Sequence, residues 1–428
     1  MIFIAADISE YRKHYTAILG GLLLCVFPFI LLLHPDLIST GDDFPYYVER
    51  VSNFKSLKQI LFDSSSEPPG FYLITFIFLW FAPISEELYL GLFRIVLVSF
   101  DYLAVFMITY KLTEDSEIAL VASVLTLTPL ISFVYIQSAF KQSFAYTLLL
   151  LLVMTSICEY PQRKIKRSVI QIVLAIFTLI SHYIVALVLI SGIFFYLLYW
   201  LIDLLSKSLK HAQSSYASSF VLLLAIISYY VYLFNFEMRI YPLFLDLFNF
   251  KPYWKVVEIT DYYSRFIAAQ PESLLDWLFL LGFLGIPWVA LIFNIYATRA
   301  EIKQKGRMTI SILVVALYFL PFGWVFSIML TCPHLLCAIA FNSRNEQSVL
   351  NQSAWLSAII MAIIFLSFAF FPLEYGIYRF LALAPFVVTI LSLDSFIFLK
   401  KRISDNLFLI LFVSLSINAF LILCSSLF

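Results

Sequence analysis

The sequence predicts an all-α, polytopic membrane protein, and two observations indicate this class. Of its 428 residues, 62% are hydrophobic and only 13% are charged, and the mean hydropathy is +0.95. A soluble domain carries about 25% charged residues and exposes few large apolar patches. Apolar runs of about 20 residues, the length that crosses a bilayer, also recur along the whole chain. The composition therefore excludes a soluble enzyme, a disordered chain and a nucleic-acid binder, and no nucleic-acid partner is expected.

The positions of Lys and Arg predict the orientation of the chain. Short loops rich in these residues face the cytoplasm in membrane proteins. The ranges 159–168, 298–309 and 400–405 are such loops. With these loops inside, the alternation of spans places the N-terminus in the cytoplasm and predicts about 13 transmembrane helices in one membrane domain, residues 1–428. The expected order is a first span at 17–33, an external loop at 34–87, spans 2–7 at 88–234, a second external loop at 235–273 and spans 8–13 at 274–428.

The first external loop is expected to carry interfacial helices. Residues 71–83 are apolar, but they are too few to cross a bilayer and are followed by two glutamates. We therefore expect a membrane-embedded or interfacial helix on the external side there. The second span is expected at 88–110.

Later spans are expected as helix pairs between the basic loops. Residues 169–202 are just long enough for two helices that turn near Ser181-His182-Tyr183. Residues 118–158 form a similar pair that turns near 137–142. A span at 380–399 leads into the basic loop that begins at Lys400.

Basic and polar side chains gather at the external ends of different predicted spans. Such groups are costly inside a bilayer and usually face a cavity or a pathway there. They are Arg94, Lys141 with Gln142, His182, His334 and Arg379. Each alone has a structural alternative, because long basic side chains extend to the interface and a histidine can be an ordinary packed residue. Their convergence on one side favours a binding site.

Carboxylates in the first external loop supply the opposite charge. Asp42-Asp43 precede an aromatic segment, and Glu67 directly precedes Pro68-Pro69, which disfavour helix at that point. A solvated turn is the structural alternative for the acidic pair. Two acids at an interface can instead bind a divalent cation, Mg²⁺ or Mn²⁺, here through Asp43 and Glu67. As another alternative, one acid acts as general base toward an acceptor hydroxyl, while arginines bind a phosphate.

The order of these features resembles the GT-C superfamily of membrane glycosyltransferases, of the protein O-mannosyltransferase and aminoarabinose-transferase type. The resemblance lies in a first span, an external loop with an acidic pair (Asp42-Asp43), and then Glu67-Pro68-Pro69-Gly70-Phe71-Tyr72 before an arginine, Arg94, in the next span. Such enzymes take a sugar from a polyprenyl-phosphate or polyprenyl-pyrophosphate donor on the external face. The resemblance implies that Asp42, Asp43 and Glu67 are catalytic and that Arg94 and Arg379 contact the donor phosphate.

A second resemblance departs from the first. The segment Ser138-Ala139-Phe140-Lys141-Gln142, with Ser181-His182-Tyr183 later, is similar to Wzy-like polysaccharide polymerases, in which a basic residue followed by Gln, and then a His, recur on successive spans. This leaves open whether the enzyme adds one sugar or joins lipid-linked repeat units. In both readings Lys141 is a further phosphate contact, and Tyr46, Tyr47, Tyr72, Gln142 and His182 contact substrate.

The expected protein is thus a glycosyltransferase of cell-surface polysaccharide or glycoconjugate synthesis. Its partners are a polyprenyl-linked donor, the lipid bilayer, and a glycan, lipid or protein acceptor. The resemblance implies a bacterial inner (plasma) membrane, with the active site facing outward. A rival from another class is a transporter or flippase of lipid-linked sugars, for which internal repeats and binding groups near the midplane are typical. A structural subunit without catalysis is the third alternative, and it predicts that the acidic pair is dispensable.

Overall fold

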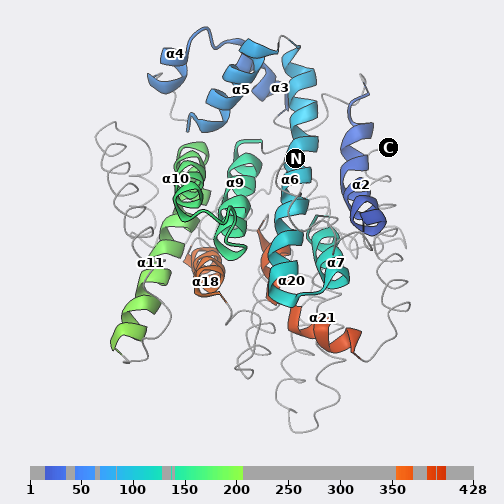
Figure 1. Cartoon of the computed structure of the whole chain (residues 1–428). Helices are drawn as coiled ribbons and strands as arrows, with labels where there is room; N and C mark the ends of the chain where they lie inside the picture. The colour runs from blue at the N-terminus through green and yellow to red at the C-terminus, as the bar shows by residue number, and fades with distance from the viewer. Residues whose placement is uncertain are drawn as a thin grey trace, which may run out of the picture.

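Figure 1 shows the computed structural model of the chain. It describes residues 15–34, 44–62, 68–82, 84–127, 136, 140–205, 353–369, 383–391 and 393–401. This part of the chain is mostly helical and contains no β-strand, which confirms the predicted all-α class. Three of its helices are long and apolar enough to cross a membrane: Glu86–Thr113, Phe140–Ile157 and Tyr183–Leu201. The second external loop and most of spans 8–13 lie outside the described residues, so the number of spans stays a prediction.

The first predicted span is helix α2, Tyr15–Leu31, which packs against α6 (Glu86–Thr113) and α7 (Ser116–Leu127). The hydroxyl of Tyr102 in α6 donates a hydrogen bond of 3.0 Å to the carbonyl oxygen of Ile18. A Cβ atom at Gly21 would lie 2.6 Å from that same hydroxyl oxygen. The glycine is therefore needed for the close approach of the first two predicted spans.

Three short helices lie in the segment that is predicted to be the first external loop. They are α3 (Phe44–Ser52), α4 (Leu57–Phe62) and α5 (Gly70–Phe81), and Figure 1 shows them together at the end of the molecule where α6 begins. Helix α5 is too short to span a bilayer, as expected. At its end the side chains of Trp80 and Phe81 are 74% and 77% exposed. Exposed aromatic residues at a helix end are typical of the membrane interface.

Helix α6 is the predicted second span, extended at both ends. It begins after Ser85, whose Oγ accepts a hydrogen bond from the N–H of Leu88, and the two glutamates of its first turn complement the helix dipole. It ends at Glu114, which has a left-handed backbone (φ 54°) and donates its N–H to the carbonyl oxygen of Tyr110. The ends of this span are therefore set by local capping.

The predicted helix pair at 169–202 is α10 (Lys164–Ser181) followed by α11 (Tyr183–Leu205). His182 lies between them with an extended backbone, φ −158° and ψ 127°, so the predicted break near 181–183 is confirmed. Helix α9 (Phe140–Ile157) packs between α6 and α10. The side-chain amide of Gln171 in α10 donates a hydrogen bond of 3.0 Å to Ser156 Oγ in α9.

Helices from the C-terminal part of the chain pack against the N-terminal ones. Helix α18 (Ala354–Ala369) lies along α11, and a Cβ atom at Gly192 would overlap the side chain of Ile359. Helices α20 (Ala384–Leu391) and α21 (Leu393–Lys400) both contact α7 and fall within the single span predicted at 380–399.

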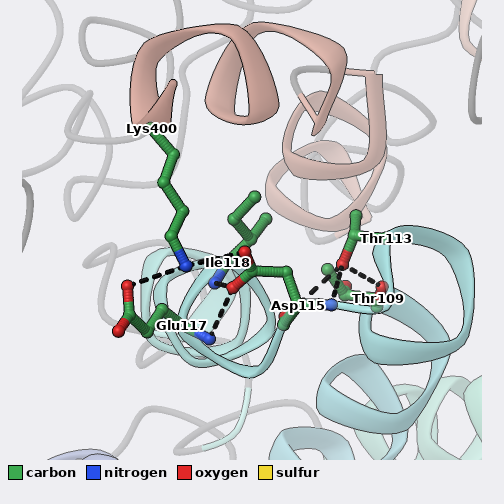
Figure 2. Close-up of polar contacts among 6 residues, drawn as sticks. All are labelled: Thr109, Thr113, Asp115, Glu117, Ile118 and Lys400. Carbon is green, nitrogen blue, oxygen red and sulfur yellow. Dashed lines mark hydrogen bonds and ion pairs between the residues drawn. The ribbon is translucent and has the colours of Figure 1, made fainter. Parts of the chain in front are cut away.

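Lys400, at the end of α21, lies against the connection between α6 and α7 (Figure 2). Its Nζ is 2.6 Å from Oδ2 of Asp115 and 2.9 Å from a carboxylate oxygen of Glu117, and we call these three residues the Lys400 triad. Burial alone would lower the pKa of Lys400, but the hydrogen bonds and charges of the two carboxylates outweigh it and raise the pKa. The triad brings the end of α6 and the end of α21 to the same side of the molecule.

Apolar side chains at helical spacing are exposed on the outer faces of several helices. On α6 they recur every four residues, and a similar stripe follows α10: Leu88, Leu92, Val96 and Phe100, then Val169, Val173 and Ile176. A soluble monomer rarely exposes stripes of this kind, whereas helices that face lipid require them. Together with the three long apolar helices, these stripes support a membrane protein.

Candidate functional site

The described residues include seven of the eleven side chains that the sequence predicts for the site. Asp42, Asp43, Glu67 and Arg379 lie outside the described residues. The other seven come from three regions, namely α3 with α5, the beginnings of α6 and α9, and the break between α10 and α11: Tyr46, Tyr47, Tyr72, Arg94, Lys141, Gln142 and His182.

Lys141 lies at the second position of α9 and is half-buried. Its Nζ is 5.7 Å from the centroid of the Tyr47 ring and 5.5 Å from that of the Tyr72 ring. Both tyrosines are buried, at 5% and 2% exposure. A cation near the face of an aromatic ring is stabilised by the ring quadrupole, by about 0.5–2 kcal/mol. The structure thus brings together three predicted site residues from three different helices.

Arg94 is completely buried, unlike Lys141. Its Cζ lies 4.5 Å from the centroid of the Phe44 ring and 5.2 Å from that of the Phe140 ring. The guanidinium group therefore lies close to both the first residue of α3 and the first residue of α9.

Aromatic rings surround both cations. Phe71, the second residue of α5, has ring centroids within 5.4–6.3 Å of five other rings, which are those of Tyr47, Tyr72, Phe93, Phe140 and Phe144. With Phe44, these residues form what we call the aromatic cluster. Water is largely excluded from such packing, so the electrostatic attraction between a bound anion and a cation at its edge is strengthened.

The start of α5 lies against the end of α10. A Cβ atom at Gly70 would lie 3.0 Å from the backbone carbon of Ile180 and would overlap Ser181 Oγ. The segment that follows Glu67 is therefore beside His182, which is 4% exposed and has its ring stacked on Tyr183 at 4.8 Å. Two motifs about a hundred residues apart in the sequence thus belong to one region of the structure.

Two of the predicted substrate contacts, Gln142 and Tyr46, have surroundings different from those of Tyr47 and Tyr72. The side-chain amide of Gln142, which is 3% exposed, donates a hydrogen bond of 3.0 Å to the hydroxyl of Tyr146 one turn further along α9. Tyr46 is 43% exposed, and its ring packs edge-on against Tyr47 at 5.5 Å. Gln142 is therefore part of the packing of α9, and Tyr46 lies on the outer side of α3.

No group of three His, Cys, Asp or Glu side chains suited to a metal ion occurs in the described part of the chain. The two predicted metal ligands, Asp43 and Glu67, are not in that part.

Sequence reasoning missed the phenylalanines of the aromatic cluster. The chain has 45 phenylalanines, so no single one stands out by type or spacing. One weak signal was present, because Phe44 directly follows Asp43 and Phe140 directly precedes Lys141. A phenylalanine next to a charged residue indicates a site residue only when a second charged residue is known to lie close to it in the fold.

The described geometry is that of a half-buried cation at the edge of a cluster of buried aromatic rings. The Nζ of Lys141 lies near the rings of Tyr47 and Tyr72, both of which are buried. The resemblance to glycosyltransferases and polymerases rests on sequence motifs. No protein-family model matches the chain, and comparison with curated proteins and with solved structures found nothing significantly similar to it.

Proposed function

We propose that the chain is an integral-membrane glycosyltransferase that uses a polyprenyl-phosphate or polyprenyl-pyrophosphate donor. It transfers the sugar, or a glycan repeat unit, to an acceptor at the external face of the membrane. The observation that carries the proposal is the position of Lys141, a half-buried cation near the rings of Tyr47 and Tyr72. An ammonium group suits the donor phosphate, and the ring of Tyr46, which is 43% exposed, suits the apolar face of a sugar.

In the proposed reaction an acceptor hydroxyl attacks the anomeric carbon of the donor sugar. Asp42 or Asp43 takes the hydroxyl proton, the bond between the anomeric carbon and the phosphate oxygen breaks, and the phosphate leaves with the negative charge. Lys141 and Arg379 stabilise that charge, an effect that is large where water is excluded. Direct displacement of this kind inverts the anomeric configuration. Glu67 is the second acidic residue, either beside the base or as a ligand, with Asp43, of a divalent cation.

The decisive experiment is a transfer assay with purified protein in nanodiscs, a labelled polyprenyl-linked sugar and a soluble acceptor. We expect Asp43→Asn to abolish transfer and Lys141→Met to raise the KM for the donor by roughly tenfold, the loss of about 1.4 kcal/mol of binding. Lys58→Met is the matched control, because Lys58 is an exposed lysine of α4. Full activity in Asp42→Asn, Asp43→Asn and Glu67→Gln alike would refute the proposed site. Addition of a chelator separates metal-dependent from metal-free chemistry.

A polysaccharide polymerase is the second candidate. It is favoured by the contact of Gly70 with the end of α10, which places His182 beside the segment that follows Glu67. With lipid-linked repeat units as the only substrate, a polymerase yields a ladder of products, whereas a single transferase yields none. Movement of the labelled donor across a vesicle membrane without any transfer would instead favour the transporter.

A further inference from the structure

Arg94 joins the beginnings of two helices. Its Cζ lies 4.5 Å from the centroid of the Phe44 ring and 5.2 Å from that of the Phe140 ring, and no part of its side chain is exposed. Phe44 is the first residue of α3, and Phe140 is the first residue of α9. The two rings also contact each other, with centroids 5.9 Å apart, and Tyr47 of α3 contacts Phe140 at 5.3 Å.

The sequence neighbours of these two rings are the residues expected to do the chemistry. Asp42-Asp43 directly precede Phe44, and Lys141 directly follows Phe140. Consecutive Cα atoms are 3.8 Å apart, so the position of Phe140 limits the position of Lys141. A guanidinium group that contacts both rings therefore limits the distance between the beginning of α3 and Lys141.

We infer that Arg94 is a positioning residue, which holds the beginning of α3 against α9 through its contacts with Phe44 and Phe140. In this role it sets the separation between the beginning of α3 and Lys141 and does not contact the donor. The consequence for sugar transfer rests on the proposed function, but the placement of α3 does not. A fully buried guanidinium close to two rings is suited to this role, because its charge attracts both rings.

The placement of α3 is tested by the distance between two spin labels, independently of activity. The labels are attached at Tyr46→Cys and Leu92→Cys, two exposed positions on α3 and α6, after the five native cysteines have been replaced. We expect one narrow distance distribution in the parent, a broad one in Arg94→Met and an intermediate one in Arg94→Lys. Phe44→Leu, which removes one ring, is expected to broaden the distribution as Arg94→Met does, and the double variant is expected to add nothing further.

The matched control is Arg50→Met, which removes another cation that lies over a ring, 5.7 Å from the centroid of Phe54 and within the α3 region. It is expected to leave the distribution narrow. If Arg94→Met does not fold, Phe44→Leu keeps the test open, because it leaves Arg94 in place. A narrow distribution in Phe44→Leu, or in a folded Arg94→Met, overturns the inference whether or not the protein transfers sugar.

Kinetics then separate positioning from donor binding. A positioning role predicts that kcat falls roughly tenfold in Arg94→Met while the KM for the donor is unchanged, and that Arg94→Lys restores part of kcat. Lys141→Met is expected to show the opposite, a raised KM. A raised donor KM in Arg94→Met with an unchanged label distance would show that Arg94 contacts the donor, and the inference would be wrong.

Discussion

Lys141 and Arg94 illustrate how the surroundings of a residue, more than its charge, decide what it does. Both are cations beside aromatic rings at one end of the molecule. Lys141 is half-buried, whereas Arg94 exposes none of its surface. The sequence predicts the same phosphate-binding role for both. This difference in burial is the reason we propose that Lys141 contacts a ligand and that Arg94 contacts only the protein.

Gly70 provides a test at the scale of one residue. A Cβ atom there would meet Ser181 Oγ and the backbone of Ile180, so Gly70→Ala is expected to displace α5 from α10. Overpacking of this kind costs about 1–3 kcal/mol, which thermal unfolding in detergent would detect as a lowered Tm.

Gly20→Ala is the matched control for this substitution, because nothing lies within 4 Å of a Cβ atom at Gly20. Alanine there is expected to keep or raise the Tm, because it favours helix by up to about 1 kcal/mol. An equal loss of Tm in both variants would contradict the close packing of α5 on α10.

At the scale of an element, Asp115 has two roles at the beginning of α7. Its Oδ1 accepts hydrogen bonds from the N–H groups of Glu117 and Ile118, at 3.0 and 3.1 Å, while Oδ2 pairs with Lys400 (Figure 2). Asp115→Asn is expected to keep the cap and lose the ion pair, because asparagine caps helices as well as aspartate does. Asp115→Ala loses both.

The two variants therefore separate the cap from the ion pair. Thermal unfolding is expected to show that Asp115→Ala is less stable than Asp115→Asn by about 1 kcal/mol, the worth of a cap. Equal stability of the two variants would mean that the cap contributes nothing to α7.

The Lys400 triad also predicts a dependence of stability on pH. Burial opposes the charge of Lys400, but Asp115 and Glu117 raise its pKa above the ordinary value of 10.5. A group whose pKa is higher in the folded than in the unfolded chain contributes full stability below the unfolded pKa and loses it as the pH rises through the folded one. Lys400→Met is therefore expected to lower the Tm at neutral pH, and the difference from wild type should narrow only above about pH 10.5.

The size of this effect is expected to be small. The side chains of the triad are 22–33% exposed, and partly exposed ion pairs contribute about 0.2–1 kcal/mol. Met is used because it keeps the apolar stem of the lysine. A difference in Tm that is the same at neutral and at strongly alkaline pH would assign the loss to packing instead of charge.

At the scale of the whole molecule, the helices place two groups of exposed residues at opposite ends. Figure 1 shows α3 at the end where α6 begins, and α21 at the other end, where the Lys400 triad joins it to α7. In a protein without native cysteines, single cysteines at Tyr46 and Glu87 are expected to react with an impermeant maleimide from outside intact cells. Cysteines at Glu114 and Lys401 are expected to react only after permeabilisation.

Two results of the labelling experiment would contradict this expectation. The opposite pattern at all four positions would show that the orientation predicted from the basic loops is inverted. A difference between Glu114 and Lys401 would contradict the Lys400 triad, because its ion pairs require both residues on one side.

Much of the helix content was predictable because it depends on local sequence. Apolar runs predict the helices, and polar N-caps such as Ser85 and Asp115 begin them at defined residues. The break at His182 follows from the length of the apolar stretch, which suits two helices and exceeds one. The candidate site was predictable only in part, since Arg94, Lys141, Tyr47 and Tyr72 stand out by charge or by motif, whereas the phenylalanines around them do not.

The sequence by itself determined that this is a helical chain with apolar helices of membrane-spanning length, because hydrophobicity and chain length act along the sequence. The tertiary structure alone decided that Lys141 lies near Tyr47 and Tyr72, that Arg94 lies close to Phe44 and Phe140, and that Lys400 pairs with Asp115 across 285 residues of sequence. Such contacts depend on which helix faces pack together. The small residues and aromatic rings at each interface determine which faces pack, and these residues do not recur at a regular spacing in the sequence.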